Sequence, residues 1–130
     1  MAREAEFADC QSRLERLVSG QSDIKGALVT KEDGRIIVTH TGDMPAERIA
    51  TMGASLVSLG SALAEAVAHG ANEFVFLQNR DGYVASRAIA DGYRLTVVAD
   101  RWINTELLLS VSQSAAEELG SALKWGCGSE

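Results

Sequence analysis

The side chains best suited to acid–base or nucleophilic chemistry are few, and they form no recognised catalytic pattern. The two histidines, His40 and His69, each stand alone where a strand or a helix is expected to end. The sequence holds no nucleophile elbow, zinc-protease helix or phosphate-binding loop, each of which needs a fixed spacing of its residues. The sequence therefore predicts no catalytic residue, and we expect a protein that is not an enzyme.

Three aspartates directly precede glycines, and this pairing is typical of turns rather than of paired catalytic carboxylates. They are Asp33, Asp81 and Asp91. Glycine accepts the positive φ that tight turns require, and aspartate favours turn conformations. Gly53 and Gly60 do not follow a predicted strand, so they do not form a dinucleotide-binding fingerprint. No cofactor is predicted.

Arginine is the side chain here with the clearest capacity for recognition. Its planar guanidinium donates paired hydrogen bonds that match phosphate or carboxylate groups. Arg80, Arg87 and Arg101 are therefore candidates for contacts with a partner, including contacts with its phosphate. Ordinary surface charge is the alternative interpretation for each of them.

Cysteine usage, charge and hydropathy exclude several classes of protein. Cys10 and Cys127 lie near opposite ends without metal-type spacing, so neither a disulfide framework nor a metal site is predicted. A formal net charge of -6 without a basic run argues against binding to nucleic acid or anionic membranes. The N-terminus has no signal-like apolar segment, and no stretch is expected to approach the roughly 20 apolar residues needed to span a bilayer. No membrane insertion is predicted. A cytoplasmic protein is predicted.

Hydrophobic periodicity and turn residues define the elements that position these side chains. Helices are expected over residues 4–19, 46–69 and about 104–125, and strands over 24–30, 35–40, 72–79, 83–90 and 93–99. The order is α-β-β-α-β-β-β-α, and short turns join most of the strands. The fold class is therefore α/β, an α+β sandwich with a five-stranded, mostly antiparallel sheet. One long helix should cover one face and the terminal helices the other, with residues 1–125 forming a single domain and 126–130 a loose tail.

The long helix presents two adjacent surfaces. A broad apolar stripe is expected to lie on the sheet, and it comprises Ile49, Met52, Leu56, Leu59, Leu63 and Val67. A neighbouring flank of small residues includes Gly53, Val57, Gly60 and Ala64. Each glycine costs about 1 kcal/mol relative to alanine within a helix, and close approach of a second backbone would offset this loss. We predict that this flank contacts a second copy of the chain, and the alternative is that it only accommodates the chain's own sheet.

The combined order of elements and local motifs resembles the Roadblock/dynein light chain family. The segment Ile24–Thr30 followed by Asp33-Gly34 resembles the family's opening hairpin, and the long helix resembles its central helix. Residues 80–84 and 91–98 resemble its last two strands. The similarity covers about residues 5–120.

This resemblance implies a homodimer in which central helices pack together and sheets join edge to edge. The strand at residues 72–79 would then pair with its copy and bring Phe74, Val75 and Phe76 into the dimer interface. Family members scaffold other proteins or regulate Ras-like small GTPases, and stand-alone prokaryotic members are often associated with such GTPases. The family shares no catalytic residue set, so the resemblance implies a non-catalytic regulator or scaffold.

A small-ligand sensor of the PAS or profilin-like type is the alternative function. A sensor needs a cavity with converging polar groups. Only the aromatic trio of Phe74, Phe76 and Tyr83 hints at one, and the same residues suit a core or an interface. The space between the long helix and the sheet distinguishes the two functions, because a packed interior favours the regulator and a roomy polar cavity favours the sensor.

Overall fold

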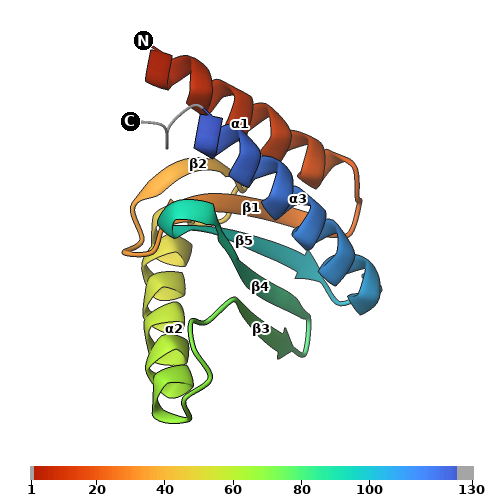
Figure 1. Ribbon diagram of the computed structural model, residues 1–130. Helices are drawn as coiled ribbons and strands as arrows, with labels where there is room; N and C mark the ends of the chain where they lie inside the picture. Colours follow the sequence, from red (N-terminus) through yellow and green to blue (C-terminus); the bar gives the residue numbers. More distant parts are fainter. Residues whose placement is uncertain (1, 126–130) are drawn as a thin grey trace.

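An antiparallel sheet of five strands separates two helical layers of unequal size (Figure 1). The computed structural model describes residues 2–125, so the predicted C-terminal tail at 126–130 lies outside the described residues. The elements are α1 (Ala2–Ser19), β1 (Ile24–Lys31), β2 (Ile36–His40), α2 (Ala46–Ala66), β3 (Phe74–Asn79), β4 (Gly82–Ile89), the 3₁₀ helix η1 (Ala90–Gly92), β5 (Tyr93–Asp100) and α3 (Thr105–Trp125). The predicted fold class and order of helices and strands are confirmed.

The strands are ordered β2-β1-β5-β4-β3, and every pair of neighbours is antiparallel. The two edge strands are therefore β2 and β3. A single 3₁₀ turn, η1, replaces the simple turn expected between β4 and β5. The long helix ends at Ala66 rather than at His69, because the backbone then turns through positive φ at Ala68 (58°) and Gly70 (84°).

The main hydrophobic core lies between the sheet and the layer formed by α1 and α3. In Figure 1 these two helices run side by side across one face of the sheet. The alternation of side chains along β1 and β5 directs one set of apolar residues into this core. Burial of each large aliphatic side chain contributes roughly 1.5–3 kcal/mol. Members that are 0–1% exposed include Cys10, Leu14, Val29, Leu95, Val97, Leu108, Leu119 and Leu123.

The helix α2 lies on the opposite face, and only Ala50 and Val57 of this helix are buried. The prediction that the broad apolar stripe lies on the sheet is wrong. Met52, Leu59 and Leu63 are 63%, 70% and 64% exposed. The small flank faces the sheet instead, because the sheet surface below α2 carries short or polar side chains that admit close approach, namely Thr30, Ser86, Arg94 and Thr96.

The exposure of α2 changes one further expectation. Among the described residues, α2 is the one helix long and apolar enough to cross a bilayer by length and composition, a test that core helices of soluble proteins also pass. The expectation that no segment has this length and hydropathy is therefore wrong. Only 11% of the most apolar stretch of α2 is buried, so this helix presents apolar surface that the single chain does not cover.

Candidate functional site

An uncovered apolar surface runs along α2 towards the edge strand β3. We call Met52, Leu59, Leu63 and Val67 the exposed stripe, and these side chains are 50–70% exposed. On β3, Leu77 is 38% exposed and shares a face with Val75, because alternate residues of a strand point the same way. The helix and the strand adjoin, since a Cβ built on Gly60 of α2, on the flank next to the exposed stripe, would lie 3.4 Å from Val75 Cγ2.

The backbone of β3 has a free edge. The amide of Ala88 donates to the carbonyl of Glu73 at 2.9 Å, which fixes the hydrogen-bonded pairs of the β3–β4 ladder. Successive residues of an antiparallel strand direct their backbone N–H and C=O groups to opposite sides. Val75 therefore directs its backbone groups to β4, and Phe74 and Phe76 direct theirs to the open edge. Of the three β3 residues predicted at a dimer interface, Phe74 and Phe76 offer backbone hydrogen bonds there.

The small flank of α2 is engaged within the chain. Val57 is 6% exposed, and a Cβ on Gly60 would meet Asn72 and Val75 of the same chain. Gly53 and Ala64 are half-buried on the same side of the helix. The alternative interpretation, that a glycine accommodates the chain's own sheet, thus applies at Gly60. The exposed stripe is the part of α2 that remains available to a second chain.

The two glycines of α2 predict opposite responses to added side chains. A Cβ at Gly53 would meet no atom within 4 Å, so Gly53→Ala should stabilise the protein by about 1 kcal/mol through helix propensity alone. Gly60→Leu should destabilise it by about 1–3 kcal/mol, because a Cβ there already lies 3.4 Å from Asn72 Nδ2. Urea unfolding at one fixed protein concentration measures both. Equal effects of the two substitutions would contradict the packing of this flank.

The three candidate arginines occupy two separate places. Arg80 is exposed in the β3–β4 turn. Arg101 lies at the same end of the sheet, where its Nη1 is 3.5 Å from Asp81 Oδ1 and its guanidinium carbon is 4.5 Å from the ring centroid of Trp102. The Trp102 side chain is 70% exposed. Arg87 lies away from this cluster, on β4 beside α3.

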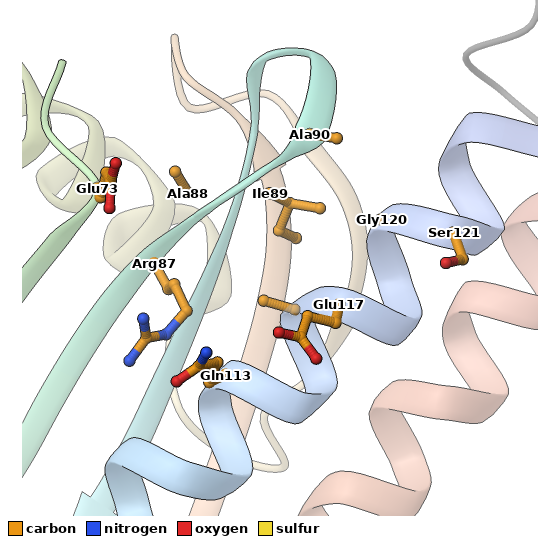
Figure 2. Close-up of a pocket in the computed structure, with 10 residues that line it drawn as sticks. Glu73, Arg87, Ala88, Ile89, Ala90, Gln113, Glu117, Gly120 and Ser121 are labelled. Atoms are coloured by element: carbon orange, nitrogen blue, oxygen red, sulfur yellow. The ribbon is translucent and has the colours of Figure 1, made fainter.

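Arg87 lies in a surface trench of about 690 Å³ between α3 and the β4–η1 segment (Figure 2). Its guanidinium carbon stands 4.2 Å from the ring centroid of Phe74, and its Nε donates to Ser112 Oγ at 3.4 Å. Burial lowers the pKa of Arg87, and the nearby carboxylates of Glu117 and Glu73 partly offset this effect. The remaining lining residues are Ala88, Ile89, Ala90, Gln113, Ala116, Gly120 and Ser121.

Arg94 on β5 is a buried polar residue that the sequence analysis missed. It is 2% exposed and donates to both Oγ and the carbonyl of Ser86, at 3.2 and 3.0 Å. It also donates to the carbonyl and Oδ1 of Asn72, at 3.2 and 3.3 Å. Burial lowers its pKa, and Glu32 counteracts part of this shift. Arg94 thus ties the segment that leads into β3 to the centre of the sheet.

The space between α2 and the sheet is closely packed. The cavity there measures about 10 Å³ and is lined by Ser86, Arg94 and Thr96, among others. This volume is at the lower limit for a single water molecule. The packing favours the regulator over the small-ligand sensor.

Comparison with known structures agrees with this architecture. Gliding protein MglB from Thermus thermophilus superposes with a TM-score of 0.85 at 16% identity, covering 94% of this chain and 93% of that one. MglB from Myxococcus xanthus gives 0.83 at 16% identity, with 91% and 90% covered. A Roadblock/LC7 domain from Streptomyces avermitilis gives 0.80 at 20% identity, with 87% and 96% covered. At these identities the likeness shows the fold.

Sequence comparison identifies the family. No curated protein sequence matches the chain. The profile of the Roadblock/LC7 domain matches residues 11–99, which extend from within α1 to the last residue but one of β5 and make up more than half of the chain. This chain therefore belongs to the Roadblock/LC7 domain family.

Proposed function

We propose that the protein is a homodimeric, non-catalytic regulator or scaffold whose partner is a Ras-like small GTPase. The observation that carries the proposal is the exposed stripe of α2 beside the open edge of β3. Contiguous apolar surface of this kind marks protein interaction sites. An open strand edge with apolar neighbours likewise invites pairing with another strand.

A second copy of the chain suits both features at once. Antiparallel pairing of β3 with its copy is compatible with a two-fold axis, which is the commonest symmetry of dimers. The two sheets would join, and the two α2 helices would lie on the same face of the joined sheet. Their exposed stripes would cover Leu59 and Leu63 of each copy, and the edge amides of Phe74 and Phe76 would gain partners.

The GTPase assignment rests on the family and on one surface feature. Roadblock proteins include regulators of Ras-like GTPases, as the sequence resemblance implies. Arg101 and the exposed Trp102 form a stacked pair of the residue types that dominate the energetics of protein interfaces. With Arg80 nearby, this end of the sheet offers guanidinium groups to a charged partner. A cytoplasmic location follows from this proposal, because such GTPases act there.

Binding to a Ras-like GTPase from the same cell tests this function. Calorimetry should show an affinity that differs at least about tenfold between the GDP-bound and GTP-analogue-bound forms, within the usual range of coupling between sites. Arg101→Ala should weaken binding, whereas Arg35→Ala, at the exposed β1–β2 turn, should not. GTP hydrolysis measured in the same mixtures separates activation from tethering. Failure of every such GTPase to bind in either nucleotide state would count against the assignment.

A further inference from the structure

The sheet face that carries α1 and α3 is incompletely covered next to the edge strand. Helix α1 packs on β1 and β2, and α3 packs on β4, β5 and η1. Beyond α3, three half-buried aromatic rings form a stack. The ring centroids of Phe74 and Phe76 are 6.0 Å apart, and those of Phe76 and Tyr83 are 5.5 Å apart. The trench that contains Arg87 lies beside this stack.

The guanidinium of Arg87 keeps most of its hydrogen-bonding capacity unused. It has five N–H donors, and among the described residues only Nε has a partner, the Ser112 hydroxyl at the long distance of 3.4 Å. Its terminal nitrogens have no hydrogen-bond partner among the residues that the structure describes. The stacking on Phe74 holds the guanidinium in place. A positioned, partly desolvated fork of this kind is suited to binding a carboxylate with two parallel hydrogen bonds.

The charges around Arg87 restrict the ligand. Figure 2 shows Arg87 between Glu73 and Glu117, and both glutamates line the trench. A ligand with several negative charges, such as a phosphate, would be repelled by this pair. A single carboxylate flanked by positive charges would satisfy all three side chains.

The shape of the trench favours a peptide over a free metabolite. Its α3 wall runs from Gln113 to Ser121, about 12 Å of helix, which matches about four residues of extended chain. Several residues that line the trench are exposed, namely Glu73, Ala90, Gln113 and Glu117. A small molecule bound there would therefore remain largely in contact with water. Sites for free small molecules normally bury most of the ligand surface.

We propose that the trench between α3 and β4 binds a short peptide segment of a partner protein, in which an aspartate or glutamate pairs with Arg87. Lysine or arginine residues on either side of this acid meet Glu73 and Glu117, and apolar side chains cover Ala88 and Ala90. The trench lies on the opposite face of the sheet from α2, so pairing of the exposed stripes does not cover it, although its lining residue Glu73 adjoins the β3 edge that joins the proposed dimer. This site is therefore additional to the proposed homodimer interface.

Selection from an unbiased display library of 12-residue peptides, against the full-length protein, tests the site. The enriched peptides should share one acidic residue with basic neighbours, and synthetic versions should perturb the backbone amide resonances of residues 87–90 and 113–121. Arg87→Met should weaken their binding at least about tenfold, because it removes one partner of a desolvated charge pair. Arg35→Met, an exposed arginine at the β1–β2 turn and outside the trench lining, is the matched control and should leave peptide affinity unchanged.

A double-mutant cycle separates direct pairing from an effect on folding. Replacing the peptide's acid by its amide should weaken binding to the native protein, and the amide peptide should bind native protein and Arg87→Met equally. Additive losses, or enriched peptides without an acid, would overturn the proposal. Binding of acetate or citrate with the affinity of the peptides would assign the trench to free carboxylates and overturn the proposal. A peptide-induced change in the dimer dissociation constant would assign the trench to a second copy and would overturn it as well. An absence of selected peptides also counts against it.

Discussion

Leu59→Glu should convert the protein from a dimer into a monomer at micromolar concentration. Leu59 is 70% exposed in the single chain, and the proposed pairing buries it in both copies. Loss of two buried leucines removes roughly 3–6 kcal/mol, and burial of a carboxylate adds a further penalty. The dimer dissociation constant should therefore rise by more than about 100-fold. Sedimentation equilibrium across a dilution series measures this change.

Ser58→Glu provides the matched control, because Ser58 is exposed on the neighbouring side of α2, outside the exposed stripe. It introduces the same charge on the same turn and should leave the dimer intact. The secondary structure of Leu59→Glu should be unchanged, since its side chain makes few contacts within the chain. An unchanged dimer constant for Leu59→Glu, or an equal loss in both variants, would refute the assignment of the interface.

Arg94→Met should lower the free energy of unfolding by about 3 kcal/mol. The substitution retains most of the packing of the side chain but removes two hydrogen bonds to part-buried acceptors of Asn72 and two to the buried Ser86. Each unsatisfied buried group costs about 1–3 kcal/mol. Relief of the desolvated positive charge offsets part of this sum, so the net effect is smaller than four hydrogen bonds would suggest. The melting temperature should fall by roughly 10 °C.

Arg35→Met is the control for the loss of an arginine. Arg35 has a side chain that is 73% exposed and pairs with Asp33 at the β1–β2 turn, so its replacement should change stability by less than about 0.5 kcal/mol. Hydrogen exchange adds a local measurement. In Arg94→Met, the amides of β3 should exchange faster, because Asn72 no longer holds the segment that leads into this strand. Equal stability of the two variants would show that the Arg94 network contributes little.

The strands and their succession along the chain were predictable because their signals are local. The Asp33-Gly34 and Asp81-Gly82 pairs mark tight turns, and short turns enforce antiparallel neighbours. The orientation of α2 was not predictable in the same way. A helix pattern identifies its apolar side, and that side normally faces the chain's own core. Here the sheet surface below the helix carries Thr30, Ser86 and Thr96, which only the assembled sheet brings together.

The candidate site was predictable only in part, for a related reason. Residue type named Arg80, Arg87 and Arg101 as candidates for partner contacts, but their separation into an exposed end cluster and a trench depends on strand register. Arg94 gave no signal, because a polar residue between Tyr93 and Leu95 is the ordinary alternation of a strand with one face in water. Its burial follows from α2 and Asn72, which are distant in sequence.

The exposure of α2 has a consequence for the abundance of this protein in the cell. A copy without its pair displays Met52, Leu59, Leu63 and Val67 to the surrounding solution. Chaperones and proteases act on chains that expose apolar segments, and small differences in stability change protein abundance several-fold. The side chains proposed to join two copies would therefore mark an orphan subunit for removal. The steady-state amount of the protein would then follow the rate of pairing as well as the rate of synthesis.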